Sequence, residues 1–300
     1  MFLRWLLNNY VGQAAQAKLR DSVLESVRDS FRGAASGGER REGGNPSAAE
    51  ELAPPCDVAF IFALGIESGG LLDLLQQSTA TRLPTHQEHA GGFQGKEAVV
   101  VESGVGAAAA AQATADVIKF HQPAWVVSAG FAGGLADDLR KGQILMADMV
   151  ADTSGKELAV GLKMDPQIVA TTPGLHVGRL VTVDKLIRTQ AEKRRLAAAS
   201  RALACDMESF AVAQTCARLN TRFLSIRIIS DAVDDELPKE IGKLLAQKTW
   251  AGKLGAAAQA VFSRPSSAAD LLKLQDDALK YSDRLARFLA GVVGQLPAPK

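Results

Sequence analysis

Between residues 57 and 231, apolar positions cluster into short runs, and helix-like stretches separate most of these runs. Apolar runs of strand length that end in glycine or polar residues are typical of buried strands. Leucine and alanine at helical spacing between them predict crossover helices, so the pattern indicates an α/β sheet. We predict strands over 57–64, 97–106, 123–135, 143–152, 176–184 and 223–231, and helices over 67–78, 107–120, 191–200, 207–220 and 271–293.

The first 55 residues follow a different pattern. Residues 1–32 predict an amphipathic helix whose apolar side, with Trp5 and Tyr10, would suit either a protein surface or peripheral contact with a membrane. Polar residues interrupt the apolar run too early for a transmembrane helix or a signal peptide. Residues 33–55 are rich in glycine, serine, proline and charge, which is typical of a flexible linker. We therefore expect a helix, a linker and one α/β domain over 56–300.

Composition excludes several function classes. A net charge of +1 over 300 residues gives no basic footprint for nucleic acid. The three cysteines form no CxxC pair, so we expect neither a zinc site nor a disulfide framework, and a cytoplasmic setting. No ligand spacing links the histidines, so we expect no metal or other cofactor and place all four at the surface: His86, His89, His121 and His176.

Polar groups and glycines gather where the predicted strands end. Ligands bind beyond the carboxyl ends of strands in open α/β sheets, so these positions are candidates for a site. Taken singly, each has a simpler explanation as a tight turn, a helix cap or an ion pair. The candidates are Glu67, Ser103, the loop from Gly130 to Gly134, Asp184, the helix start at Asp206–Glu208, and Ser230 with Asp231; Arg227 lies inside an apolar strand.

Four motifs occur in an order that resembles a known family: "SGVG", "SAGFAGGL", "CDMESFAVAQTC" and "RIISDAVDD". They are similar to the purine nucleoside phosphorylase superfamily, and most similar to its methylthioadenosine/S-adenosylhomocysteine nucleosidase branch. The resemblance covers Val58 to Asp235 and the last helix. It implies a three-layer α/β/α sandwich around a twisted mixed sheet that partly closes into a barrel. It also implies a homo-oligomer and cleavage of the N-glycosidic bond of a nucleoside.

The resemblance also implies roles for individual residues. Asp231 would protonate the purine N7, Glu67 would activate water, and Ser103 and Arg227 would help to place that water and Glu67. The chemistry fits, because an acid near N7 assists a poor leaving group and an oxocarbenium-like sugar forms. An arginine near Glu67 would keep it ionised. The residues implied in substrate binding are Met207 and Glu208 at the ribose, with Gly130, Gly133, Phe131, Asp184, Leu186 and Ser230; Phe131 would also suit the core.

Several functions stay open at this point. Hexameric phosphorylases of the superfamily carry an arginine and a serine where this chain has Ser128 and Phe131, and Glu67 would repel phosphate, which favours hydrolysis. Leu186 stands where the nucleosidases stack an aromatic ring on adenine. We therefore expect a purine nucleosidase for an adenosine-type nucleoside. The alternatives are a phosphorylase, a nucleosidase for a lipid-linked adenosyl nucleoside, and a non-catalytic nucleoside-binding module.

Overall fold

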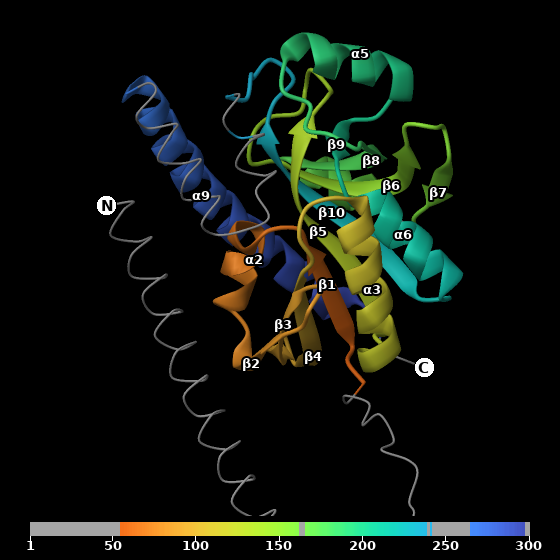
Figure 1. Ribbon diagram of the computed structural model, residues 1–300. Helices are drawn as coiled ribbons and strands as arrows, with labels where there is room; N and C mark the ends of the chain where they lie inside the picture. The colour runs from red at the N-terminus through yellow and green to blue at the C-terminus, as the bar shows by residue number, and fades with distance from the viewer. Residues whose placement is uncertain (1–54, 162–165, 239–240, 242–264, 298–300) are drawn as a thin grey trace, which may run out of the picture. The chain divides into compact units, whose positions relative to one another are not determined.

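A computed structural model describes residues 55–161, 166–238, 241 and 265–297. The helix predicted over 1–32 and nearly all of the predicted linker lie outside these residues. The described part forms a mixed sheet with helices on both faces (Figure 1). Among the described helices, none has the length and apolar character needed to cross a membrane.

Ten strands of the described part make up one sheet, in the order β10-β6-β8-β9-β5-β1-β4-β3-β2, with β7 paired to β6. Strand β10 also pairs in parallel with β5, so five strands close into a ring: β5, β10, β6, β8 and β9. This confirms the predicted mixed sheet with partial closure. The strands are β1 Val58–Phe62, β2 Gln76–Arg82, β3 Gln87–Phe93, β4 Lys96–Glu102, β5 Trp125–Gly134, β6 Ile144–Asp152, β7 Glu157–Ala159, β8 Leu175–Thr182, β9 Ala204–Asp206 and β10 Arg222–Asp231.

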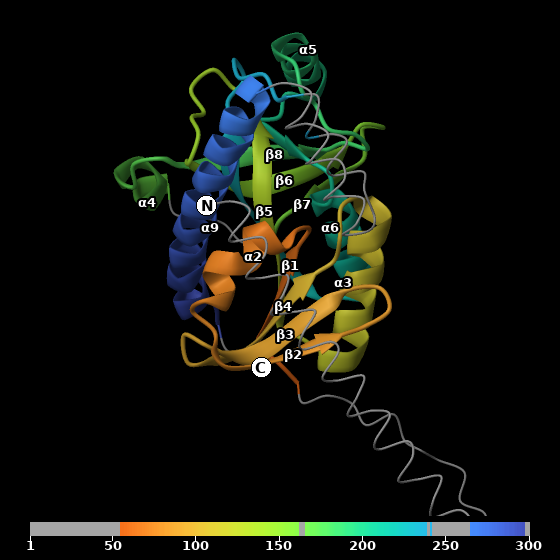
Figure 2. The same ribbon diagram turned by 60° about the vertical axis from the view of Figure 1, so that its left-hand side comes forward.

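Alternation along the strands divides the core between the two faces of the sheet. In β1, Val58, Phe60 and Phe62 pack on the side of α2 and α9, while Ala59 and Ile61 pack on the side of α3 and α6. The two views show the same helix pairs on opposite faces (Figures 1 and 2). The three-layer prediction is therefore confirmed. The helices are α2 Gly65–Leu72, α3 Ala107–His121, α4 Pro166–Thr171, α5 Gln190–Ser200, α6 Ser209–Arg218 and α9 Pro265–Gln295.

A close contact between α2 and α9 fixes the short helix that carries Glu67. A Cβ atom on Gly70 would lie 2.7 Å from the carbonyl oxygen of Ser282, so only glycine fits there. The Ser282 hydroxyl accepts from the Gly70 N–H at 2.8 Å and donates to the Glu67 carbonyl at 3.0 Å. The C-terminal helix thus positions the first helix of the domain.

The helix predicted over 67–78 is too long. Helix α2 ends at Leu72, and Gln76–Arg82 forms β2, antiparallel to β3. Strand β2 lies at the end of the sheet and is exposed at every residue, so it lacks the apolar alternation by which strands are recognised. Strand β3 has two glycines and no regular apolar period, and it was missed for the same reason.

Two of the four histidines predicted at the surface are buried. The Nε2 atoms of His86 and His121 donate to the two carboxylate oxygens of Glu88 at 2.8 and 2.9 Å. Burial disfavours the charged form of Glu88, but the hydrogen bonds from both rings outweigh it and lower its pKa to about 2. The surface prediction failed for these two because their partner, Glu88, lies on a strand that was not predicted.

This cluster predicts an acid-sensitive contribution to stability. Because the Glu88 pKa is depressed, the stabilisation is complete above about pH 4.5 and is lost as the pH falls toward 2. Glu88→Gln should lower the free energy of unfolding at pH 7 by about 2 kcal/mol, and by less at pH 3. Urea unfolding at both pH values measures the difference. Glu97→Gln, at an exposed site on the neighbouring strand β4, is the control; an equal loss at both pH values for Glu88→Gln would contradict this account.

Candidate active site

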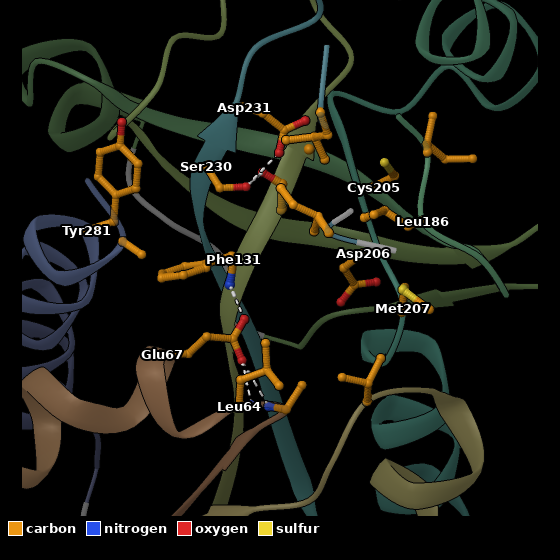
Figure 3. A pocket seen from close by; sticks show the side chains of 18 of the residues that line it. Leu64, Glu67, Phe131, Leu186, Cys205, Asp206, Met207, Ser230, Asp231 and Tyr281 are labelled. Carbon is orange, nitrogen blue, oxygen red and sulfur yellow. Dashed lines mark hydrogen bonds between the residues drawn. The ribbon is translucent and has the colours of Figure 1, made fainter. Parts of the chain in front are cut away.

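A cavity of about 350 Å³ opens where β1, β5, β9 and β10 end, and α9 contributes to its wall (Figure 3). Most of its lining is apolar, and its acidic residues include three predicted members of the site, which come from separate segments: Glu67, Glu208 and Asp231. The structure brings most of the predicted site residues to this cavity: Glu67, Phe131, Gly133, Leu186, Met207, Glu208, Ser230 and Asp231.

Glu67 lies in the first turn of α2 and is held entirely by main-chain donors. Its Oε2 accepts from the N–H groups of Ala63 and Leu64 at 3.1 and 2.9 Å, and its Oε1 accepts from Phe131 at 2.8 Å. Burial raises the pKa of Glu67 despite these bonds and the nearby Arg227. The expectation that arginine keeps Glu67 ionised therefore misjudged the balance, since removal from water is the larger effect. A fixed carboxylate with a raised pKa suits a general base.

Arg227 is anchored on a different carboxylate from the one expected. Its Nε and Nη2 atoms donate to Asp206 Oδ2 at 3.0 and 2.7 Å. Nη2 also donates to the hydroxyls of Ser128 and Ser209 at 2.7 and 2.9 Å. A buried guanidinium needs a buried anion, and Asp206, at the end of β9, supplies it.

Two glycines of β5 make room for the carboxyl groups of Glu67 and Asp231. A Cβ on Gly130 would lie 2.8 Å from Glu67 Oε1 and 3.0 Å from Arg227 Nη1. A Cβ on Gly133 would lie 3.3 Å from Asp231 Oδ2. The glycine loop is therefore more than a turn, because each glycine leaves the space that one acidic side chain fills.

Glu208 precedes α6 and faces the cavity beside Met207. Its Oε1 accepts from the Gly106 N–H at 2.7 Å. Burial, with Asp206 and Glu67 nearby, raises the pKa of Glu208 to about 8. One oxygen of this carboxyl group is thus tied to the main chain beside the cavity.

Asp231 ends β10 and is buried at the opposite side of the cavity from Glu67 (Figure 3). The Ser230 hydroxyl donates to its Oδ1 at 2.6 Å, and Lys193 Nζ lies 2.5 Å from its Oδ2. Asp231 is therefore a buried carboxyl group at the cavity wall, held between a hydroxyl donor and a buried ammonium.

Four predicted residues lie outside the cavity lining. Two of them, Gly130 and Arg227, are packed against Glu67, as described above. Ser103 donates to the carbonyls of Phe62 and Gly104 at 3.1 and 2.9 Å, so it ties the end of β4 to the end of β1. Asp184 is exposed.

Sequence reasoning missed three residues of the site. Asp206 was among the candidates at the helix start, with a cap as the simpler explanation, but it was given no role in the site. Lys193 gave no signal, because its segment reads as a charged helix. Tyr281, on α9, lines the cavity and packs edge-on against Phe131 with ring centroids 6.4 Å apart.

Comparison with known proteins fixes the family. The model of the phosphorylase superfamily matches residues 58–262. The chain belongs to this superfamily. Curated relatives include the 5'-methylthioadenosine/S-adenosylhomocysteine nucleosidase of Shewanella pealeana, 26% identical over 63% of this chain and 92% of the relative. That of Shewanella piezotolerans is 28% identical over 60% and 87%.

Solved structures of the superfamily share the fold. The nucleosidase of Neisseria meningitidis in complex with methylthio-immucillin-A superposes with a TM-score of 0.59 and 23% identity, over 80% of this chain and 99% of that one. The Helicobacter pylori nucleosidase with butyl-thio-DADMe-Immucillin-A gives 0.62 and 19%, over 82% and 100%. Both likenesses support the mixed α/β fold described above.

The packing at Gly130 predicts an effect of a single methyl group. Gly130→Ala should push Glu67 and Arg227 apart and lower the free energy of unfolding by about 1–3 kcal/mol. Gly161→Ala, where a Cβ meets nothing within 4 Å, is the matched control and should change stability little. Urea unfolding measures both variants. If they are equally stable, a Cβ at residue 130 does not displace the Glu67 side chain, which would contradict this account.

Proposed function

We propose that the chain hydrolyses the N-glycosidic bond of an adenosine-type nucleoside to a free purine base and a free sugar. The observation that carries the proposal is one cavity that has Asp231 and Glu67 at opposite sides and Glu208 in the same lining. An acid for the leaving base and a base for the attacking water must stand on opposite sides of the bond that breaks.

At the purine end, Asp231 would act as the general acid. Its proton passes to N7 while the bond between C1' and N9 breaks and the electron pair enters the purine ring. General acid assistance of this kind contributes roughly 10²–10⁴-fold to the rate. Leu186 and Cys205 line the cavity with Asp231 and would pack on the base; Leu186 supplies an apolar contact without ring stacking.

At the sugar, Glu208 would accept hydrogen bonds from the ribose hydroxyls, and Met207 would pack against the ring. Carboxylate oxygens accept two neighbouring hydroxyls well. The raised pKa of Glu208 also means that ligand hydroxyls compete with a proton for this group near pH 8.

At the opposite face, Glu67 would take a proton from the attacking water as its oxygen bonds to C1'. The three main-chain donors fix the direction of this carboxylate, so little reorganisation is needed during the reaction. The Arg227 guanidinium lies beside Gly130, close to Glu67, and would act on Glu67 through its charge, rather than bind water as first expected.

Phosphate is a poor nucleophile for this cavity. The Ser128 hydroxyl already accepts from Arg227, and the Phe131 N–H already donates to Glu67. Lys141 lines the cavity and pairs with Asp235 at 3.3 Å. An incoming phosphate would meet the Glu67 carboxyl instead of donors, which favours water.

The proposed reaction leaves open which group the nucleoside carries at its 5' position. The names of the curated relatives point to 5'-methylthioadenosine and S-adenosylhomocysteine as first substrates to test. A lipid-linked adenosyl nucleoside, a homo-oligomer, and membrane contact through residues 1–32 remain predictions from the sequence.

A direct assay tests the proposed reaction. The full chain is incubated with 5'-methylthioadenosine, S-adenosylhomocysteine or adenosine, with and without phosphate, and the base and sugar are identified by mass spectrometry. We expect adenine and a free sugar at the same rate without phosphate. A sugar 1-phosphate that appears only with phosphate would make the protein a phosphorylase, and binding without base release would make it a binding module.

The role of Asp231 predicts a large effect of a small substitution. Asp231→Asn should lower kcat by about 10²–10⁴-fold, because the amide has no acidic proton for N7. Asp234→Asn, at an exposed ion pair three residues further on, should leave kcat unchanged. Retention of activity within a few-fold in a folded Asp231→Asn protein would exclude Asp231 as the acid.

A further inference from the structure

Lys193, on α5, is completely buried behind the cavity. Lysine is almost never fully buried without partners, because its ammonium loses its hydration. Here Nζ donates to the carbonyls of Ala232 and Asp235 at 2.6 and 2.9 Å and lies 2.5 Å from Asp231 Oδ2. The sequence has thus placed a costly charge against the acid of the proposed reaction.

The contact with Asp231 is made on the side away from the ligand. Lys193 does not line the cavity, whereas Asp231 and Ser230 do. Asp231 Oδ2 is buried and accepts no aligned hydrogen bond among the described residues, so the ammonium is what compensates it. Lys193 can therefore influence a bound nucleoside only through the residues that it holds, which are Asp231 and the main chain of Ala232 and Asp235.

We propose that Lys193 is a positioning residue for Asp231, an inference that rests on the proposed function. As the Asp231 proton moves to N7 and the C1'–N9 bond breaks, a carboxylate remains in a buried place. The ammonium at Oδ2 balances this new negative charge and holds the carboxyl group toward the purine. A buried carboxylate without such a partner is strongly disfavoured, so proton donation would be slower.

The same contact predicts that replacement of Lys193 changes the pH profile of the reaction. An ammonium attracts a carboxylate more strongly than a neutral carboxyl group, so Lys193, 2.5 Å from Asp231 Oδ2, acts on the form of Asp231 that remains after proton donation. The other titratable groups around this part of the cavity are Cys205 of β9, Tyr281 of α9, and Lys141 with its partner Asp235. Burial raises the pKa of Cys205 to about 12 and also raises that of Tyr281, so both stay neutral. Lys141 is paired with Asp235 at 3.3 Å, whereas Lys193 is the cation in direct contact with Asp231.

The test is the pH profile of kcat/KM for adenine release by the full chain, with Lys193→Met, Lys193→Gln and Lys193→Arg. Removal of the charge should lower the maximum by about 10-fold or more and move the descending limb to higher pH. Lys193→Arg keeps the charge and should keep the limb in place. Arg194→Met removes an exposed, ion-paired cation from the next position of the same helix and should leave the profile unchanged.

The outcomes separate this inference from the proposed function. If the wild-type chain releases no base, the proposed function fails, and this inference fails with it. If the wild-type chain is active and the limb of the folded neutral variants stays in place, Lys193 is only structural and this inference alone is overturned. Thermal unfolding checks each variant; Lys193→Gln keeps an N–H donor for the two carbonyls, so a neutral protein is available even if Lys193→Met does not fold.

Discussion

The buried ion pair between Arg227 and Asp206 is the interaction on which the site depends. It joins β10 to β9 across the ring of strands, and both residues are almost inaccessible to water. Thr182 of β8 donates to the free oxygen of Asp206 at 2.7 Å, so a third strand is tied to the same carboxylate. Loss of one partner would leave an uncompensated charge, which typically costs about 3–5 kcal/mol. The pair is therefore satisfied on all sides, and its place in the ring is fixed.

The other site residues are positioned by a series of contacts that begins at this ion pair. Arg227 stands behind Gly130, and Glu67 stands in front of it. Helix α9 then fixes Glu67 through Ser282 and Gly70, while Lys193 of α5 fixes Asp231. The two carboxyl groups that would perform the chemistry are thus placed by buried polar contacts on either side of a mostly apolar cavity. Such preorganisation is what stabilises developing charge at low cost.

The sequence predicted those parts of the fold that have a strong apolar period. Strand β10, with its run of isoleucines, and the alanine-rich α3 have such periods, and both lie where they were expected. Strand β2 was not predicted, because a polar strand at the sheet edge carries no apolar signal.

The sequence predicted which residues form the site better than it predicted which residues they contact. The ordered motifs contain Glu208 and Asp231, and the resemblance that they carry implied Glu67; all three line the cavity. They could not identify which carboxylate Arg227 would meet, because Asp206 and Glu67 are far apart in sequence and only closure of the ring decides between them. Lys193 could not be predicted for the same reason. A lysine in a charged helix is normally solvated, and here only the tertiary packing buries it.

In the proposed binding mode, the purine of a nucleoside contacts Asp231 and its ribose contacts Glu208. A crystal structure with an adenosine analogue whose C1' bond to the base cannot break tests this most directly. We predict an Asp231 oxygen about 2.7–3.2 Å from the N7 position, Glu208 in contact with the ribose hydroxyls, and a water between Glu67 and C1'. A base bound away from Asp231, or a ribose that does not touch Glu208, would contradict the account.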